Sequence, residues 1–293
     1  QAVRNYGYGD TNWGDLLKSY NGKSISYDSI GNPLDDGTWE YTWKEGRKLD
    51  TMSDGSTTWT FIYDGNGMRI RRTNSSSTYN YGYHGSQLTH MTYGNITLHF
   101  YYDVSGRPLS VTYNNATYYY VLNLQGDVVA ILDSSGNKVV GYKYDAWGRL
   151  LETSGSMKLT LGQYNPLRYR GYVYDEETGL YYLESRYYNP EIGRFINADS
   201  LISTGQGILG YNMFAYCGNN PINRYDSSGQ AWDVILDVLS LGWSLYDFIK
   251  EPSLENAGWL ALDVAFAVAP FLTGSSIMKA ASKLDDVSEI GGY

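Results

Sequence analysis

Cysteine and histidine are scarce in this chain of 293 residues, which contains one Cys and three His. A single cysteine, Cys217, excludes an intramolecular disulfide. Its position in an aromatic segment predicts a buried small side chain rather than a nucleophile. His84, His90 and His99 have neither an HExxH motif nor a cysteine partner, so we expect them to be sheet residues. No metal site and no cofactor is therefore predicted.

Basic residues are outnumbered, because 22 Lys and Arg face 31 Asp and Glu and give a formal net charge of −9. Nucleic-acid affinity depends on Lys and Arg that neutralise phosphates, so no nucleic-acid partner is predicted. The N-terminus lacks an initiator Met and also lacks the basic region and apolar run of a signal peptide. We therefore expect the chain to be a fragment of a longer protein.

Long apolar runs are missing as well, although residues 231–250 have apolar side chains at helical spacing and Pro252 follows them. The next apolar run, 257–272, is 16 residues long and contains Asp263. A membrane span needs roughly 20 apolar residues. A helical hairpin packed in protein is thus favoured over membrane contact of 231–272, and a further helix is expected over 277–290.

Tyrosine and glycine are abundant instead, with 31 and 33 residues. An aromatic residue, an Asp and a Gly recur together along residues 1–163. One glycine marks each repeat unit, and these glycines lie 15 to 22 residues apart. Asp side chains cap tight turns and Gly accepts positive φ, so each repeat unit is predicted to form one β-hairpin. Because a lone hairpin is marginal in water, successive units must share a sheet. The glycine marks are Gly31, Gly46, Gly67, Gly85, Gly106, Gly126 and Gly148.

Residues 164–230 differ from the repeats in carrying more closely spaced turns. Short aromatic segments at 168–174, 180–187, 193–196 and 211–216 are bounded by Gly, Asn or Pro and predict strands. The fold class is therefore mainly β, with three regions: hairpin repeats over 1–163, a core region over 164–230 and a small α-helical segment over 231–293.

Two segments of the core region carry a family resemblance. RYRGYVYDEETGLYYLESRYYNPEIGRFINADS at 168–200 and YCGNNPINRYDSSG at 216–229 resemble the Rhs-associated core of Rhs and related polymorphic toxin proteins. The words YDxxGR and YDxxGN in the repeats resemble YD repeats. The resemblance implies a hairpin ribbon coiled into part of a hollow shell with a core plug. It also implies that 231–293 is a pre-toxin segment and that the active toxin domain is absent from this chain.

Asp199 and Asp226 are the candidate catalytic residues. Two nearby carboxylates do not ionise together easily, so one can hold a proton while the other activates water. The resemblance implies self-cleavage by this pair after a DPxGL word, with Arg194 as a supporting cation. That word is DSSGQ here, which gives Gln230–Ala231 as the scissile bond. Aspartates in Gly-containing turns are also explained as turn formers, so any enzyme activity is at most that of an aspartyl autoprotease.

The predicted function is encapsulation and delivery of a C-terminal toxin in competition between bacterial cells. The implied location is secreted or at the bacterial cell surface. The implied partners are the chain's own toxin segment inside the shell, an immunity protein and export machinery. The alternative is a surface adhesin without toxin activity, in which exposed Tyr and Trp stack on cell-wall glycans.

Overall fold

A computed structural model describes residues 3–200, 211–226, 228–230, 233–234 and 250. The chain divides into two units, 1–204 with 208–233 and 205–207 with 234–293. The first unit contains nearly all of the described residues. The helical segment predicted over 231–293 lies outside the described residues except for 233–234 and 250, so it stays a prediction. No helix among the described residues is long and apolar enough to cross a membrane.

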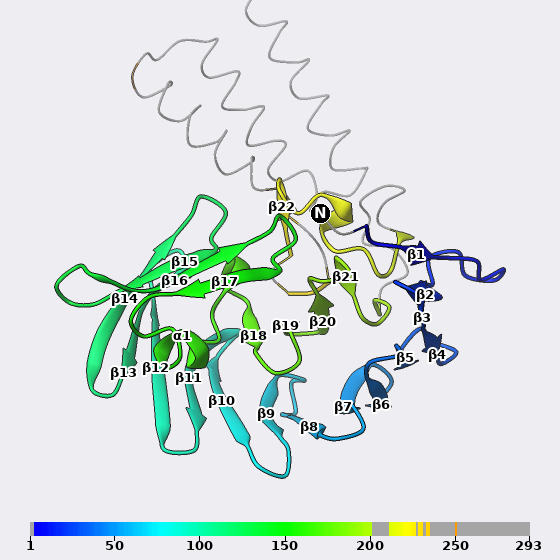
Figure 1. Cartoon of the computed structure of the whole chain (residues 1–293), viewed down its shortest axis with the longest axis horizontal. Coiled ribbons are helices and arrows are strands. Elements are labelled where there is room, and N and C mark those ends of the chain that lie inside the picture. Colours follow the sequence, from blue (N-terminus) through cyan, green and yellow to red (C-terminus); the bar gives the residue numbers. More distant parts are fainter. Residues whose placement is uncertain (1–2, 201–210, 227, 231–232, 235–249, 251–293) are drawn as a thin grey trace, which may run out of the picture. The chain divides into compact units, whose positions relative to one another are not determined.

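Fourteen strands form one antiparallel sheet in which each strand pairs with its neighbours in the sequence, from β4 at one edge to β17 at the other (Figure 1). We call this sheet the ribbon. Its two edge strands do not pair with each other, so the ribbon is not closed into a barrel. The strands are β4 (Ser26–Tyr27), β5 (Pro33–Asp35), β6 (Glu40–Lys44), β7 (Lys48–Ser53), β8 (Thr58–Tyr63), β9 (Arg69–Thr73), β10 (Thr78–His84), β11 (Gln87–Tyr93), β12 (Ile96–Tyr102), β13 (Pro108–Tyr113), β14 (Ala116–Leu122), β15 (Val128–Leu132), β16 (Lys138–Tyr144) and β17 (Leu150–Ser154).

The turns of the ribbon confirm the roles predicted for Asp and Gly. Asp64 Oδ1 accepts hydrogen bonds from the backbone N–H groups of Asn66 and Met68, both at 2.9 Å. Gly67 completes the turn with φ +88, a conformation that side chains resist. The aspartate therefore holds its own turn closed. The same carboxylate bonds recur at Asp28, Asp103, Asp133 and Asp145.

A second sheet of four antiparallel strands follows the ribbon, and we call it the plug. It comprises β18 (Val173–Asp175), β19 (Leu180–Leu183), β20 (Arg186–Asn189) and β21 (Arg194–Phe195). The predicted turns at 175–179 and 188–193 join these strands. A short helix, α1 (Leu161–Tyr164), connects the ribbon to the plug. Three short strands, β1 (Tyr6–Gly7), β2 (Ser19–Tyr20) and β3 (Lys23–Ser24), precede the ribbon, and β22 (Arg224–Tyr225) pairs with β23 (Asp233–Val234).

Three of the predicted core strands differ in the structure. The segment 180–187 is not one strand, because a turn at Glu184, which has φ +55, divides it into the antiparallel strands β19 and β20. Residues 168–174 form a 3-10 turn, η1 (Tyr169–Gly171), before β18 begins. Arg170 has φ +56 and its N–H donates to Asp127 Oδ1 at 3.0 Å, so a tertiary contact interrupts the strand. Residues 211–216 contribute only an isolated bridge between Ala215 and Arg194, followed by η3 (Cys217–Asn219). Cys217 itself is fully buried, which confirms its predicted environment.

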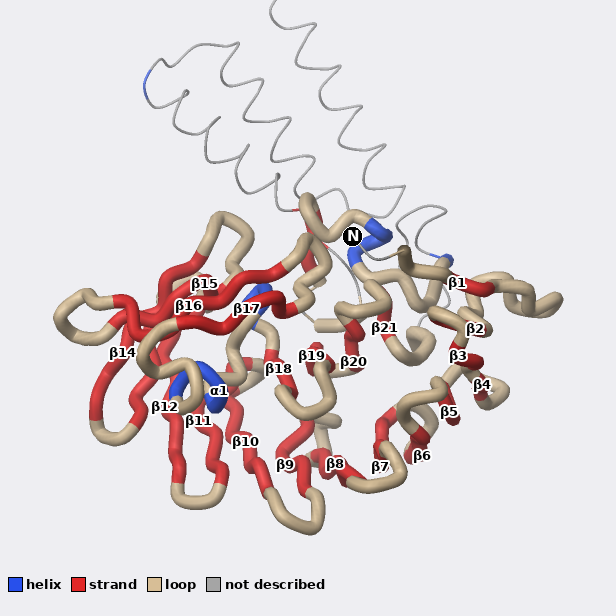
Figure 2. The backbone as a smooth tube through the Cα atoms, in the orientation of Figure 1, coloured by secondary structure: helices blue, strands red, loops and turns tan. Residues whose placement is uncertain are grey.

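The plug packs against one face of the ribbon, which curves around it (Figures 1 and 2). Ribbon strands bury alternate residues, as in β8, where Trp59 and Phe61 are buried and their neighbours are more exposed. The rings of Phe61 and Tyr187 lie 5.5 Å apart, edge to face. The core shared by the two sheets includes Leu49, Met52, Phe61, Leu98, Val111 and Ile131 of the ribbon and Leu180, Tyr182 and Tyr187 of the plug.

A buried ion pair joins the two sheets. Arg69 of β9 donates two hydrogen bonds to Asp175 of β18, and both side chains are 0% exposed. The Arg69 guanidinium lies 4.8 Å from the ring of Tyr81 and 4.6 Å from that of Tyr182. Burying charges is costly unless they are paired in good geometry. The fit of the plug on the ribbon is therefore fixed by this pair as well as by apolar contact.

Replacing Asp175 by Asn is expected to destabilise the fold strongly, because Arg69 would keep its charge in an apolar site. Breaking a buried pair costs about 3–5 kcal/mol. The control is Glu152→Gln, which removes an exposed pair with Lys143 at 2.5 Å and is expected to cost at most about 1 kcal/mol. Urea unfolding of both variants measures the difference. Equal losses would contradict a structural role for the buried pair.

Candidate functional site

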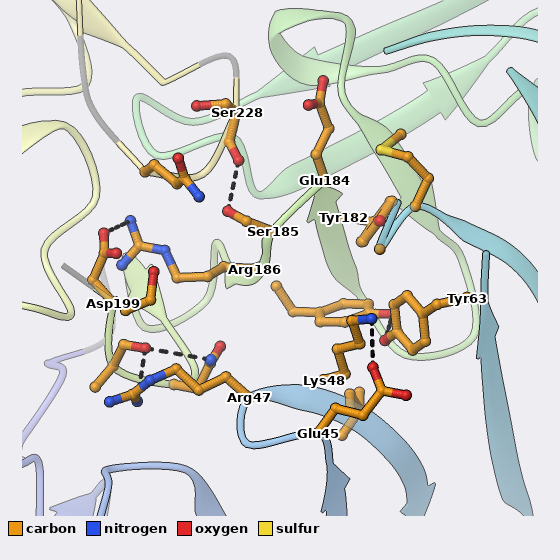
Figure 3. A pocket seen from close by; sticks show the side chains of 18 of the residues that line it. Glu45, Arg47, Lys48, Tyr63, Tyr182, Glu184, Ser185, Arg186, Asp199 and Ser228 are labelled. Carbon is orange, nitrogen blue, oxygen red and sulfur yellow. Dashed lines mark hydrogen bonds and ion pairs between the residues drawn. The ribbon is translucent and has the colours of Figure 1, made fainter. Parts of the chain in front are cut away.

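The two candidate carboxylates meet at one arginine of the plug. Arg186 Nη2 lies 2.9 Å from Asp199 Oδ2 and 3.8 Å from Asp226 Oδ2. All three side chains are almost completely buried. Figure 3 shows the pairing of Arg186 with Asp199. The structure thus brings together two aspartates that are separated by 26 residues of sequence.

The Asp226 carboxylate is held by the turn that it begins. Its Oδ1 accepts N–H groups from Ser228 at 3.3 Å, Gly229 at 2.7 Å and Gln230 at 3.2 Å. The backbone N–H of Asp226 donates to the hydroxyl of Tyr172 at 3.0 Å. These bonds bring the backbone N–H groups of residues 228–230 to one carboxylate oxygen of Asp226, and the other oxygen lies toward Arg186.

Arg186 also holds the backbone on both sides of the site. Its Nε donates to the carbonyl oxygen of Gly229, and its Nη1 donates to that of Met213 at 2.9 Å. The guanidinium lies 3.6 Å from the ring of Phe195. The Met213 carbonyl accepts a second bond, from the Asp199 N–H at 2.8 Å. One side chain therefore ties the loops of both aspartates to β20.

Arg194, predicted as the supporting cation, lies on the next strand and makes other contacts. Its guanidinium donates to the Tyr8 hydroxyl at 3.0 Å and to the Asp15 carbonyl at 2.7 Å. Arg194 thus fastens the N-terminal segment to the plug, and Arg186 is the arginine that contacts both carboxylates. The only sequence signal for Arg186 is a cation between the apolar and aromatic residues of the segment LESRYY.

Burial dominates the electrostatics of the site. It raises the pKa of Asp226 to about 6, although Arg186 and the three backbone N–H groups act in the opposite direction. Burial also lowers the pKa of the Arg186 guanidinium to about 10 against the opposing effect of Asp199 and Asp226. Asp226 can therefore hold a proton at a pH where a solvent-exposed aspartate is ionised.

A cavity of about 390 Å³ opens beside this site, between the plug and the part of the ribbon formed by β7, β8 and the turns that precede β7 and follow β8. Asp199 and Gln230 line the cavity, whereas Asp226 does not. The remaining wall is mixed, with Arg47, Lys48 and Glu184 beside the aromatic rings of Tyr63 and Tyr182 (Figure 3). Asn197 also lines it. The Oδ1 atom of Asn197 is buried without a hydrogen-bond partner. Solvent in the cavity can therefore reach Asp199 and Gln230.

Ala231, on the far side of the predicted scissile bond, lies outside the described residues. Within the described ranges, no group of three or more His, Cys, Asp or Glu side chains could hold a metal ion. The described site holds two buried carboxylates on one arginine, and Asp226 in its protonated form can act as an acid.

Comparison with known proteins places this chain among larger ones. A family model described as Teneurin YD-shell matches residues 4–222. The chain is 38% identical over 275 residues to tRNA(Glu)-specific nuclease WapA of Bacillus subtilis subsp. natto (strain BEST195), covering 92% of this chain and 11% of that protein. It is 34% identical over 101 residues to double-stranded DNA deaminase toxin A of Burkholderia cenocepacia (strain H111), covering 34% of this chain and 7% of that protein. The chain thus spans about a tenth of the length of WapA.

The fold also resembles a solved structure. The crystal structure of TcdB2-TccC3-Cdc42 matches with a TM-score of 0.57 at 19% identity, covering 78% of this chain and 13% of that one. At this identity the likeness concerns the fold alone.

Gly229→Ala is expected to disturb the site more than a matched glycine change elsewhere. Gly229 has φ +74, and a Cβ there would lie 2.5 Å from the Leu183 carbonyl oxygen. Gly136 has φ +83 with nothing within 4 Å, so Gly136→Ala tests the backbone cost alone. We expect about 1 kcal/mol for Gly136→Ala and about 1–3 kcal/mol more for Gly229→Ala. Urea unfolding compares the two variants, and equal losses of unfolding free energy would contradict close packing of Gly229 against Leu183.

Proposed function

The chain belongs to the Teneurin YD-shell family, and we propose that it is the shell and core part of a toxin that encapsulates and delivers a C-terminal toxin domain in competition between bacterial cells. The two sheets support this proposal, because the plug covers one face of a long hairpin ribbon. The protein would be secreted or exposed at the bacterial surface. Its partners would be its own toxin segment, an immunity protein and the export machinery.

The named activities of the relatives support a carrier role. Similar segments occur in proteins named as a tRNA(Glu)-specific nuclease and as a double-stranded DNA deaminase toxin. Each match covers at most 11% of those two relatives. A segment shared by proteins with different named activities is best explained as common delivery machinery. The net charge of −9 agrees with this, since phosphate binding needs clustered Lys and Arg.

We further propose that the core cleaves its own chain at Gln230–Ala231. The observation that carries this proposal is that Arg186 contacts both Asp199 and Asp226 beside a cavity that Gln230 also lines. Asp199, held by Arg186, accepts a proton from a cavity water, and the water oxygen attacks the Gln230 carbonyl carbon. Asp226 donates its proton toward the amide nitrogen as the C–N bond breaks. The products are a carboxyl group on Gln230 and an amine on Ala231.

The DSSGQ sequence departs from the DPxGL motif at Gln230, which replaces the Leu of that motif and lines the cavity. The adhesin alternative needs exposed Tyr and Trp side chains, and Tyr101 and Tyr119 of the ribbon are exposed. Every described tryptophan is buried or half-buried, namely Trp13, Trp39, Trp43, Trp59 and Trp147.

Intact-mass measurement of the expressed chain tests self-cleavage. For the wild type we expect two fragments whose masses correspond to cleavage between Gln230 and Ala231. For Asp199→Asn and for Asp226→Asn we expect only the mass of the uncut chain. The control is Asp133→Asn, which alters a half-buried turn carboxylate of the ribbon and should cleave like wild type. An uncut wild-type chain that unfolds cooperatively would overturn the cleavage proposal and leave a passive shell.

The cleavage rate is also expected to fall as the pH rises. Asp226 acts as the acid, and its pKa is raised to about 6, so its protonated fraction falls about tenfold for each pH unit well above that value. Denatured, uncut chain would be refolded by dilution at pH 5 to 8 and the cut fraction followed by mass. A rate that increases between pH 6 and pH 8 would contradict the role given to Asp226.

A further inference from the structure

Two of the three histidines face each other across neighbouring strands of the ribbon. His90 of β11 pairs with His99 of β12 in the antiparallel register, and their ring centroids lie 6.2 Å apart. Both histidines are exposed, whereas Met91 and Leu98, the next pair in the register, are buried. The two imidazoles therefore stand together on the face of the ribbon opposite the plug.

The strands around this pair carry no formal charge. Strands β10 to β15 contain no Lys, Arg, Asp or Glu. Among the described residues, neither histidine takes part in an ion pair, so salt bridging does not explain their placement. Their nitrogen atoms are thus the main metal-binding groups on this part of the ribbon.

Gly82 makes room for one of the two rings. It lies opposite His90 in the register of β10 and β11. A Cβ at position 82 would lie 1.9 Å from the Cε1 atom of His90, so any larger residue would displace the imidazole. The φ of Gly82 is not in the left-handed region, so the backbone does not require glycine there. The His90 imidazole occupies the space that a side chain at position 82 would fill.

Thr89 sets the tautomer of the same ring. Its hydroxyl donates to the Gly82 carbonyl at 2.9 Å, and its Oγ1 lies 3.2 Å from His90 Nδ1. Because the single hydroxyl hydrogen is used on the carbonyl, the oxygen acts as acceptor toward Nδ1. The hydrogen of a neutral imidazole then resides on Nδ1, which leaves the lone pair on Nε2 available. An acceptor behind a histidine is the usual second contact of a metal ligand.

We propose that His90 and His99 form a binding site for one divalent transition-metal ion. Metal–imidazole bonds are about 2.0–2.1 Å long, so two rings on one ion have their centres roughly 5–6 Å apart. The His90 nitrogen atoms lie over Gly82 in this structure, so His90 must rotate its Nε2 atom from β10 toward His99 of β12 for both rings to reach one ion. Cu²⁺ is expected to bind most tightly, ahead of Ni²⁺ and Zn²⁺. With no third His, Cys, Asp or Glu ligand among the described residues, water fills the remaining positions.

Calorimetric titration of the untagged whole chain with Cu²⁺ and with Zn²⁺ tests this site. The chain has only three histidines, so His84→Gln is a matched control that removes the one histidine outside the pair. We expect one ion per chain for wild type and for His84→Gln, and at least a tenfold loss of affinity for His90→Gln and for His99→Gln. All three positions are exposed, so the variants should keep the metal-free unfolding temperature of wild type.

Thr89→Val separates the positioning role from the ligands. It keeps all three histidines and removes the acceptor behind Nδ1, so affinity should fall several-fold while the stoichiometry stays at one. Equal affinity in wild type, His90→Gln and His99→Gln would overturn the proposal, as would the absence of metal binding by wild type. If Thr89→Val binds the metal ion with the affinity of wild type, the positioning role proposed for Thr89 is contradicted.

Discussion

Buried arginines are the constraint on which this structure depends. A ribbon of hairpins has an apolar face that must be covered, and apolar contact alone is non-directional. Arg69 and Arg72 of the ribbon strand β9 lie fully or almost fully buried against the plug, where each is paired with a carboxylate of the β18–β19 hairpin. Because an unpaired buried charge is strongly destabilising, only one placement of the plug satisfies these cations. The arginines thus fix the position of the plug on the ribbon.

The candidate site also contains a buried arginine that is paired with carboxylates. Arg186 is as deeply buried as the other arginines, but it faces two carboxylates and two backbone carbonyls. The single cation cannot compensate both acids fully, and burial raises the pKa of Asp226 to about 6. The arrangement that fastens two loops to β20 therefore also produces a carboxyl group suited to proton transfer. The adjacent cavity supplies solvent to Asp199 alone of the two.

Features of the fold that depend on bonds between residues close in sequence could be predicted from the sequence. Features that depend on tertiary contacts could not. The Asp and Gly turns of the ribbon follow from side-chain bonds within five residues, as at Asp64. Arg186 could not be singled out, because its role depends on loops that come together only in the fold. Arg170 interrupts a predicted strand through its bond to Asp127. The pairing of His90 with His99 depends on the register of β11 with β12, and the approach of Gly82 to His90 depends on the β10–β11 register, which a bulge shifts between Gly82 and Tyr83.

Native-state hydrogen exchange measures most directly whether the buried arginines make plug and ribbon one cooperative unit. The amides of β19 and β20 would be compared with those of β7 to β9 in the same sample. If the two sheets are locked together, both groups exchange with the same opening free energy and lose protection together as urea is added. Exchange in β19 and β20 that is faster by orders of magnitude, with β7 to β9 still protected, would contradict this.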